Sequence, residues 1–281
     1  MILRTPLIPF RDNTWLKLES LQPIGSFKIR GATRAVDRLD PARRAKGVVT
    51  ASAGNFAQGL CVAARAHGVA ATIIVPDTAP RTKLDAIERL GGRLIKVPFD
   101  RWWSTLEARS FPGVDGPFIH PTDDDDVIAG NGAIGVEIVQ DLPGVEQILV
   151  PWGGGGLAVG IAKAVKCRVV ACEVATAAPL TASLAAGRPV TVERIPSFVD
   201  GIGGKTVFPR MFEMAKSLLA GTRVAPLDDV KAAVRELVGR GVVAEGAGAV
   251  PVACLRQATP AVTVCVVSGG NIDAAVLREL L

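Results

Sequence analysis

Short apolar runs alternate with amphipathic stretches along this chain. The apolar runs are rich in β-branched residues and predict strands over residues 48–50, 71–75, 93–97, 147–150, 168–172 and 262–267. Apolar residues at helical spacing predict helices over 57–66, 81–90 and 227–239. This alternation indicates an α/β fold with parallel sheets that carry helices on both faces. Ligands of such sheets bind beyond the carboxyl ends of the strands.

The composition is that of a globular chain large enough to bury a core. It has 281 residues, 49% of them hydrophobic, and a formal net charge of +5. Lysine and arginine are dispersed rather than gathered in a stripe with aromatic residues, which disfavours nucleic-acid binding. No apolar segment approaches bilayer-spanning length, and the N-terminus lacks a charged region followed by a long apolar stretch. We therefore expect no membrane partner and a cytoplasmic location.

The cysteines and histidines lack the spacing of a metal, redox or triad site. The cysteines are odd in number, and we expect all of them to be small buried hydrophobic residues: Cys61, Cys167, Cys172, Cys254 and Cys265. His67 follows a predicted helix and His120 precedes a proline, which gives little support to a catalytic triad.

Lys28 lies in a tight polar segment at residues 22–32, with the sequence QPIGSFKIRGA. A lysine amine that can lose its proton forms a Schiff base with an aldehyde. Taken alone, such a lysine is more often a solvated surface residue.

A glycine loop follows the strand predicted at 147–150. Its residues are Gly153, Gly154, Gly155, Gly156 and Leu157. A glycine loop that enters a helix offers bare backbone N–H groups to a phosphate, although by itself it is also typical of a simple turn. Together with Lys28, the loop suggests pyridoxal phosphate, which carries both an aldehyde and a phosphate.

A further loop follows the strand predicted at 48–50 and precedes a helix rich in small residues. Its residues are Ser52, Ala53, Gly54 and Asn55. The N-terminus of a helix favours an anion, so this loop suits a substrate carboxylate. Ser52 and Asn55 can instead cap the helix, and the two roles can coexist.

These segments occur in a characteristic order with three others: DVIAGNG at 126–132, EGAGA at 245–249 and SGGN at 268–271. The ordered set resembles that of the threonine/serine dehydratases, which are fold-type II pyridoxal phosphate enzymes of the tryptophan synthase β-like superfamily. The resemblance runs from about Arg4 to the last residue. It implies two doubly wound parallel-sheet domains, with a large cofactor-binding domain at 1–42 and 131–281 and a small inserted domain at 43–130.

The resemblance also implies a role for each motif. Lys28 holds the cofactor and then takes the α-proton of the substrate, while the glycine loop binds the phosphate. Asn55 matches the position that hydrogen-bonds the ring hydroxyl of the cofactor. Ser268 matches the position that faces the pyridine nitrogen, although a serine there is also typical of a turn at a strand end. A neutral hydroxyl makes the ring a weaker electron sink than a carboxylate would, which suits elimination of a β-substituent.

The chain departs from the family pattern at several places. Phe56 stands where histidine is common, and Asn131-Gly132-Ala133 stands where Gln-Gly-Thr is common, so substrate fit can differ. Some relatives hold a divalent cation through a glutamate at the position of Glu173 and a second acidic residue, which is missing around 177–179, so we expect no metal. The aspartate run at 123–126 is expected to be a helix start. The chain ends soon after 268–271, so we expect no regulatory domain and no feedback inhibition.

The sequence thus predicts a lyase that converts a β-hydroxy amino acid of the threonine/serine class to a 2-oxo acid and ammonia. The alternatives are β-replacement of the cysteine-synthase type, racemisation, and a pyridoxal phosphate-binding protein with little turnover. Ala53 stands where the racemase relatives carry a serine that can protonate the second face of the substrate, which disfavours racemisation. We expect a small-molecule amino-acid substrate and a homodimer or other homo-oligomer as the assembly.

Overall fold

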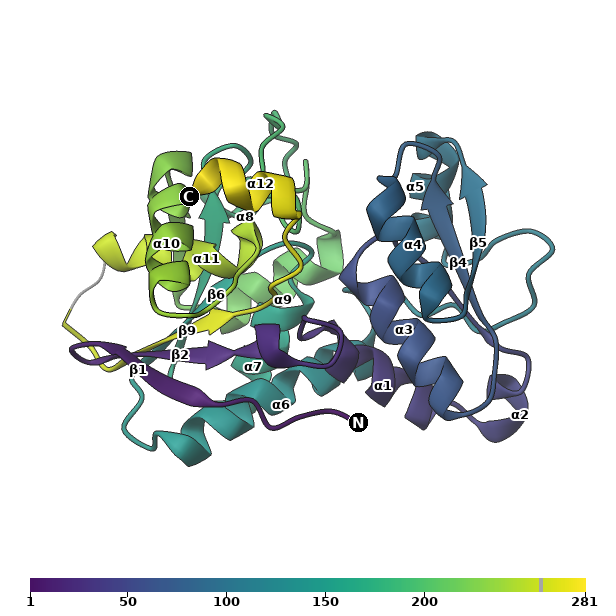
Figure 1. Cartoon of the computed structure of the whole chain (residues 1–281), viewed down its shortest axis with the longest axis horizontal. Coiled ribbons are helices and arrows are strands. Elements are labelled where there is room, and N and C mark those ends of the chain that lie inside the picture. The colour runs from purple at the N-terminus through teal and green to yellow at the C-terminus, as the bar shows by residue number, and fades with distance from the viewer. Residues whose placement is uncertain (258–259) are drawn as a thin grey trace. The chain divides into compact units, whose positions relative to one another are not determined.

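The computed structural model describes residues 1–257 and 260–281. The chain divides into two compact units (Figure 1). The large unit comprises Met1–Phe27 and Asn131–Leu281, and the small unit comprises Lys28–Gly130. The predicted domain boundaries, which group residues 1–42 with 131–281, stay a prediction.

The large unit is built on a six-stranded sheet. In spatial order its strands are β1 (Leu7–Arg11), β2 (Thr14–Leu18), β9 (Thr263–Val267), β6 (Gln147–Pro151), β7 (Arg168–Val174) and β8 (Gly221–Ala225). All neighbouring pairs are parallel except β1 and β2. The central strand β6 pairs with both β7 and β9, with Gln147 opposite Arg168 on one side and Thr263 on the other.

Helices follow most of these strands. They are η1 (Glu19–Leu21), α7 (Gly156–Ala164), α8 (Pro179–Ala186), α9 (Pro209–Leu218), α10 (Leu227–Gly239), α11 (Gly246–Ala253), η2 (Cys254–Gln257) and α12 (Ala274–Leu280). Helix α6 (Asp125–Asp141) crosses the division between the units. Local chemistry explains several helix starts. Asp273 caps α12 by accepting a hydrogen bond from the Ala275 N–H at 2.8 Å, and Asp228 and Asp229 in the first turn of α10 favour its positive end.

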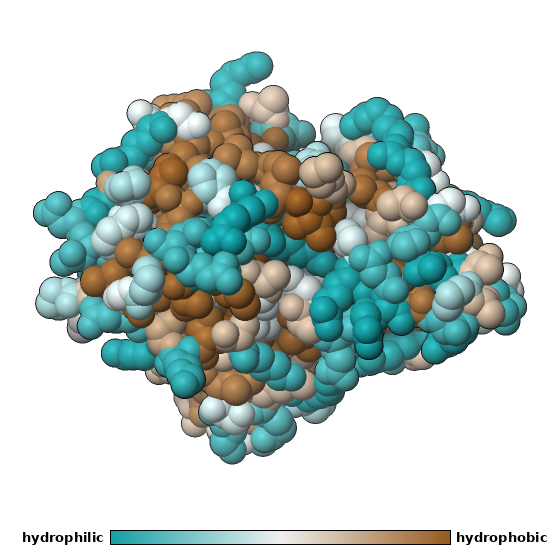
Figure 2. Space-filling model, turned by 90° about the horizontal axis from the view of Figure 1, so that it is seen from below, coloured by the Kyte–Doolittle hydropathy of each residue, from teal (hydrophilic) through white to brown (hydrophobic). Residues whose placement is uncertain are grey.

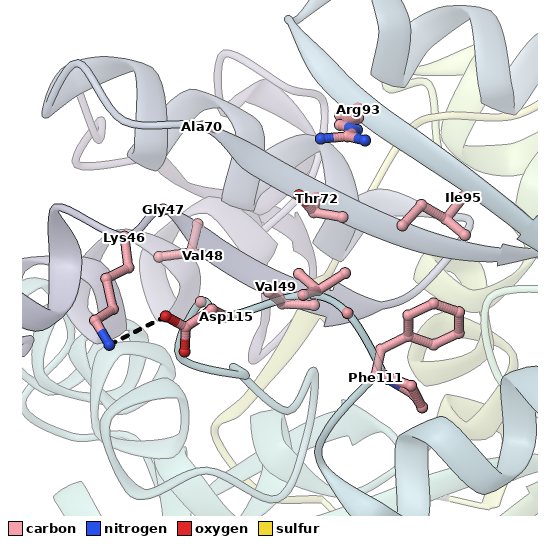
Figure 3. Close-up of a pocket in the computed structure, with 14 residues that line it drawn as sticks. Lys46, Gly47, Val48, Val49, Ala70, Thr72, Arg93, Ile95, Phe111 and Asp115 are labelled. Atoms are coloured by element: carbon pink, nitrogen blue, oxygen red, sulfur yellow. Dashed lines mark hydrogen bonds and ion pairs between the residues drawn. The ribbon is translucent and has the colours of Figure 1, made fainter.

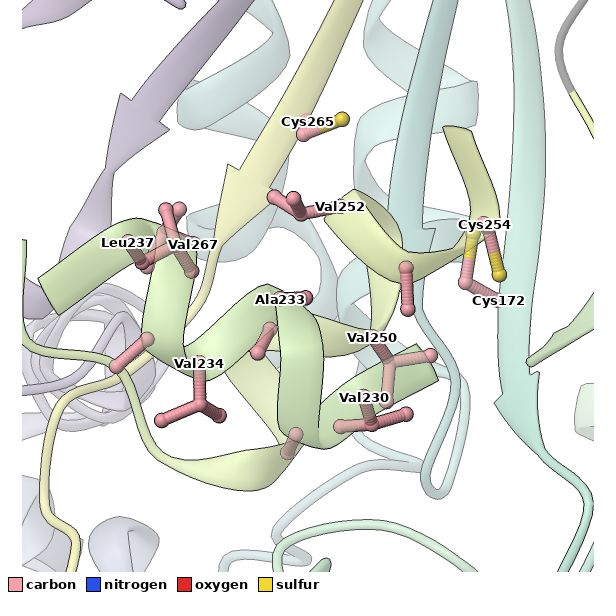
Figure 4. Close-up of a cluster of buried hydrophobic side chains, with 14 of the residues drawn as sticks. Cys172, Val230, Ala233, Val234, Leu237, Val250, Val252, Cys254, Cys265 and Val267 are labelled. Atoms are coloured by element: carbon pink, nitrogen blue, oxygen red, sulfur yellow. The ribbon is translucent and has the colours of Figure 1, made fainter. Parts of the chain in front are cut away.

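The core of the large unit lies between the sheet and helices α10 and α11. Figure 4 shows Val230, Val234 and Leu237 of α10 among buried residues of α11 and the strands. Leu149 of β6 belongs to this cluster, whereas its buried neighbours Ile148 and Val150 point to the opposite face of the sheet. Both faces of β6 are therefore covered, which explains its continuous apolar sequence.

Four of the cysteines are buried as predicted. Cys172, Cys254 and Cys265 lie in the core of the large unit (Figure 4), and burial raises the pKa of the Cys172 and Cys265 thiols. Burial also raises the pKa of Cys61, in the small unit, to about 12. The prediction was wrong for Cys167, which is only partly buried because it precedes β7 rather than lying within it.

A fully buried lysine joins β2 to α6. Lys17 is 0% exposed, and its Nζ lies 2.6 Å from Glu137 Oε2 and donates to the Thr5 carbonyl at 2.7 Å. A buried charge is tolerated only when it is paired and hydrogen-bonded. The strand thus carries a charge at its fourth residue and remains part of the core.

The small unit is built on a three-stranded parallel sheet. Its strands are β3 (Val48–Ala51), β4 (Ala71–Pro76) and β5 (Gly92–Val97), in that order. Its helices are α1 (Lys28–Arg38), α2 (Pro41–Arg44), α3 (Asn55–Ala66), α4 (Arg81–Arg89) and α5 (Phe99–Ala108). Ile73 and Val75 of β4 pack with Phe56 and Leu60 of α3 in one hydrophobic cluster. Phe118 adds a parallel bridge to Val49 at the free edge of β3.

The predicted α/β class is confirmed, and a strand lies at each predicted run, although β9 begins at Thr263, one residue after the predicted start. The predicted helices are also present, although α3 begins at Asn55, before the predicted start. The pattern did not indicate β1, β2 or β8, and the antiparallel pairing of β1 makes the large sheet mixed.

On the visible face, hydrophobic areas are interspersed with hydrophilic ones (Figure 2). Within residues 1–257 and 260–281, no helix combines the length and hydropathy that a membrane span requires.

Helix α1 is in close backbone contact with its neighbours. A Cβ at Gly59 of α3 would lie 3.1 Å from the Lys28 carbonyl oxygen and 3.2 Å from Ile29 Cα. A Cβ at Gly130 would lie 2.7 Å from the Arg30 carbonyl oxygen and 2.8 Å from Gly31 Cα. Glycine at both positions therefore allows α1 to sit against α3 and the start of α6.

We expect Gly130→Ala to lower the free energy of unfolding by about 1–3 kcal/mol, because the added methyl overlaps backbone atoms that cannot rotate away. Gly59→Ala should cost less, because the contacts of its added Cβ are longer. The gain of about 1 kcal/mol in helix propensity from alanine is common to both helical positions. Gly239→Ala is the matched control, since a Cβ there meets nothing within 4 Å. Urea unfolding of the three variants measures the difference, and equal stability of the Gly130 and Gly239 variants would contradict the packing argument.

Candidate active site

The loop predicted to bind a carboxylate follows the carboxyl end of β3. Ser52, Ala53, Gly54 and Asn55 are all partly buried, and α3 begins at Asn55. Gly54 is the N-cap residue of α3 and has no side chain with which to cap the helix. The Ser52 hydroxyl accepts a long 3.4 Å hydrogen bond from the Gly54 N–H. The first turn of α3 therefore keeps backbone N–H groups that an anion can use.

Lys28 is the first residue of α1 and is partly buried. Its Nζ donates to the Pro121 carbonyl at 3.2 Å and lies 5.8 Å from the centre of the Phe56 ring. Phe56 is the second residue of α3, so the Lys28 amine lies beside the start of that helix. The small unit thus brings Lys28 near the loop that was predicted to hold the substrate carboxylate.

His120 is a polar residue of this region to which the sequence analysis gave no role. It is 3% exposed, and its Nδ1 accepts hydrogen bonds from the Asp123 N–H at 2.8 Å and the Thr122 N–H at 3.2 Å. Burial is the largest cause that lowers the pKa of His120 to about 4. Arg109 and Lys28 act in the same direction and Asp123 in the opposite one. The ring is therefore neutral at pH 7, and the only sequence signal was its place before Pro121 and the aspartate run.

The aspartate run is a helix start, as predicted. Asp124 Oδ1 accepts hydrogen bonds from the Asp126 and Val127 N–H groups, each at 3.0 Å, and α6 begins at Asp125. Asp123 is 5% exposed and forms an ion pair of 2.5 Å with Arg109.

The glycine loop of the large unit joins β6 to α7. Gly155 has φ +89°, and a Cβ there would lie 2.4 Å from Cη2 of the Trp152 ring. Gly153 and Gly154 are partly buried rather than fully buried, and α7 begins at Gly156, with Leu157 next in its first turn. The backbone N–H groups of that first turn have no acceptor within the helix, so the donor set fits a phosphate.

Two buried polar atoms border this loop. Asn131 is 1% exposed and its Nδ2 donates to the Gly156 carbonyl at 3.2 Å, while its Oδ1 has no hydrogen-bond partner in the described part of the chain. The Nε1 of Trp152, which precedes the loop, also has none there. Buried polar atoms without partners are uncommon in proteins. These two atoms indicate that a polar ligand group can bind next to the glycine loop.

Ser268 follows β9, the strand next to β6, and is 3% exposed. Its carbonyl accepts a hydrogen bond from the Phe27 N–H at 3.0 Å, and Gly269 forms an antiparallel bridge with Ser26. The glycine loop and Ser268 therefore follow the carboxyl ends of two adjacent parallel strands, as the sequence predicts. These two elements belong to the large unit, whereas Lys28 and Asn55 belong to the small unit.

Glu173 serves as the cap of a helix. This carboxylate is 1% exposed and accepts hydrogen bonds from the Leu180 and Thr181 N–H groups, each at 2.8 Å, and from the Thr181 hydroxyl at 2.7 Å. Burial raises the pKa of Glu173, and these hydrogen bonds oppose that rise. Within residues 1–257 and 260–281, no group of three or more His, Cys, Asp or Glu side chains has the arrangement of a metal site.

A cavity of about 310 Å³ lies at the amino ends of the strands of the small unit. Figure 3 shows Val49, Thr72 and Arg93 on its three strands, together with Lys46 and Asp115, which form an ion pair of 3.2 Å. The predicted carboxylate-binding loop at residues 52–55, the Ser52 loop, follows the opposite, carboxyl end of β3. This cavity is therefore distinct from the predicted carboxylate site.

Comparison with known proteins identifies the family. The model of the family described as pyridoxal-phosphate dependent enzyme matches residues 1–269. The chain belongs to the pyridoxal-phosphate-dependent enzymes. The residues of this pyridoxal-phosphate-dependent enzyme fit the cofactor on their own chemistry, because the chain offers a lysine amine for an aldehyde and a helix N-terminus with glycines for a phosphate.

Several relatives share most of the chain. The L-threonine ammonia-lyase of Thermotoga maritima is 38% identical over 279 residues, which cover 95% of this chain and 69% of the relative. The processed threonine deaminase isoform 2 of Solanum lycopersicum has a TM-score of 0.91 at 30% identity, over 99% of this chain and 87% of that one. Maize serine racemase has a TM-score of 0.90 at 28% identity, over 99% and 91% of the two chains. The predicted fold-type II architecture is thereby confirmed.

We expect Gly155→Ala to weaken pyridoxal phosphate binding by tenfold or more, which corresponds to about 1.4 kcal/mol. A side chain at a positive φ costs about 1–2 kcal/mol, and the methyl would also overlap the Trp152 ring, so the loop must change shape. Gly144→Ala is the control, because a Cβ there meets nothing within 4 Å. Absorbance titration of the apoprotein gives both dissociation constants, and equal values would contradict a phosphate role for the loop.

Proposed function

We propose that this pyridoxal-phosphate-dependent enzyme is a lyase that dehydrates and deaminates a β-hydroxy amino acid of the threonine/serine class. The products are a 2-oxo acid and ammonia. The observation that carries the proposal is the position of the Lys28 amine beside the start of α3, where the Ser52 loop presents backbone N–H groups. The similarity to threonine ammonia-lyases and deaminases over nearly the whole chain supports the same reaction.

Each residue has a defined task in this proposal. Lys28 holds the cofactor covalently and, once its amine is free, accepts the α-proton of the substrate. The N-terminus of α3, with Ser52, Ala53, Gly54 and Asn55, binds the substrate carboxylate, and Asn55 also orients the cofactor ring. When bound, pyridoxal phosphate supplies the aldehyde that reacts with amines and the electron sink for the carbon that loses its proton.

The large unit supplies the other contacts. Gly153, Gly154, Gly155, Gly156 and Leu157 bind the phosphate. The hydroxyl of Ser268 would be the partner of the ring nitrogen, and as a neutral group it would make the ring a weaker electron sink than a carboxylate would, which suits elimination of the β-hydroxyl. Homo-oligomeric assembly, a cytoplasmic location and the absence of a bound metal stay predictions from the sequence.

We expect purified enzyme to convert L-threonine, L-serine or a close β-hydroxy relative to a 2-oxo acid with an equal amount of ammonia. Lys28→Ala should abolish turnover, because the variant lacks the amine that is proposed to hold the cofactor and to accept the α-proton. Coupled assays of 2-oxo acid and ammonia on a panel of hydroxy amino acids measure this. Formation of cysteine from O-acetylserine and sulfide, without consumption of any hydroxy amino acid, would favour β-replacement instead.

Similarity to serine racemases makes racemisation the second candidate, and Ala53 separates the two. A methyl group can neither give nor take a proton, so the unmodified enzyme should form no D-enantiomer from an L-substrate. We expect Ala53→Ser to keep dehydration within about tenfold, a change of roughly 1.4 kcal/mol in the barrier, and to add detectable racemisation. Chiral chromatography of both reactions is the measurement, and substantial racemisation by the unmodified enzyme would show that another group supplies the second proton.

A further inference from the structure

His120 lies at the same edge of the small sheet as the Ser52 loop. Phe118 bridges Val49 in parallel, the Ile119 N–H donates to the Val49 carbonyl at 2.8 Å, and the Thr50 hydroxyl donates to the Ile119 carbonyl at 2.8 Å. Residues 118–119 therefore run alongside β3 in the same direction. The residues that follow each segment, His120 and Ser52, emerge at the carboxyl edge where ligands of parallel sheets bind.

The ring of His120 closes a tight turn over Pro121. Its Nδ1 accepts from the N–H groups of Thr122 and Asp123, so the proton of the neutral ring lies on Nε2. A protonated ring would carry a hydrogen on Nδ1 and could not accept these bonds. Burial and the cations of Arg109 and Lys28 favour the neutral form, while the facing carboxylate of Asp123 favours the charged one.

The turn determines where one carbonyl points. Pro121 lies between His120 and the two N–H groups that the ring holds, and its carbonyl accepts from Lys28 Nζ at 3.2 Å. The far end of the turn is held by the ion pair of Asp123 with Arg109 and by the Asp124 cap of α6. The carbonyl that receives the Lys28 amine is therefore fixed by side-chain contacts on both sides.

We infer that His120 is a positioning residue for Lys28. Its unprotonated Nδ1 holds the turn in which the Pro121 carbonyl accepts a hydrogen bond from the Lys28 amine. This contact keeps the amine in place to react with the cofactor and to accept the substrate proton. This inference rests on the proposed function, in which Lys28 carries the cofactor. In this role His120 makes no contact with the substrate. A lysine side chain has several freely rotating bonds. A fixed hydrogen-bond acceptor for its Nζ therefore reduces the number of conformations that the amine samples before it reaches a reactive geometry.

Two substitutions of similar polarity separate this role from a general structural one. The Oδ1 of asparagine lies close to the place of the histidine Nδ1, whereas the Oε1 of glutamine reaches the place of Nε2. We expect His120→Asn to retain the turn and His120→Gln to lose it. The full-length apoprotein is mixed with saturating pyridoxal phosphate, and attachment to Lys28 is trapped with borohydride at timed intervals and located by mass spectrometry.

Attachment to Lys28 and kcat should fall more than tenfold in His120→Gln and stay within about threefold of the unmodified enzyme in His120→Asn. KM and the dissociation constant of non-covalently held pyridoxal phosphate should change less than threefold in both variants. Leu84→Ala is the control for lost stability, because Leu84 is a buried core residue of α4 in the same unit. Equal rates in the two His120 variants, or a loss in Leu84→Ala as large as in His120→Gln, would overturn the inference.

The unmodified protein provides an independent check that needs no variant to fold. Nitrogen NMR of histidine-labelled protein should show His120 as the neutral form with the proton on Nε2 from pH 8 to pH 5. A proton on Nδ1, or a titration near the ordinary histidine value of about 6.5, would overturn the inference. Borohydride trapping at a lysine other than Lys28 would overturn the proposed function itself, and the inference with it.

Discussion

Helix α1 is seated by direct contact of its backbone with the backbone of its neighbours, and the geometry around Lys28 depends on this packing. Gly130 brings the start of α6 closer to α1 than a Cβ would allow, and Gly59 brings α3 to a distance at which a Cβ would be tight. A helix held through its backbone has less freedom to shift than one held through flexible side chains. Because Lys28 is the first residue of α1, the position of its Cα is set by main-chain sterics.

Parallel strands explain why the chemically relevant groups gather in loops. In the small unit, β3 and the bridged segment at 118–119 end at one edge, where Ser52 and His120 follow them. In the large unit, β6 and β9 are adjacent and lead into the glycine loop and Ser268. The strands are rigid and covered on both faces, so short loops at their ends can hold fixed shapes. Gly155 illustrates this, since its positive φ is held against the Trp152 ring.

The continuous β-branched runs made most strands predictable, because a strand buried on both faces carries no polar position to interrupt the pattern. Strand β2 escaped detection because Lys17, the fourth of its five residues, interrupts the apolar run. The distant Glu137 and the Thr5 carbonyl make that lysine compatible with burial. The sequence also placed the Ser52 loop, the glycine loop and Ser268 after the carboxyl ends of strands. The binding roles of these residues stay predictions. The role of His120 could not be predicted from the sequence. It depends on the direction of the Pro121 carbonyl, which is set by contacts with residues distant in the chain.

The burial of the cysteines determines how the folded chain reacts with thiol reagents. Alkylating dyes react with an exposed thiolate, and Cys61, Cys172, Cys254 and Cys265 are enclosed in cores. Cys167 is the partly exposed member of the set, just before β7 in the large unit. Burial raises its pKa as well, but the residue is only partly buried in the folded chain. A thiol-reactive fluorophore added to the folded protein should therefore attach first at Cys167 and report on the large unit without any engineered attachment point.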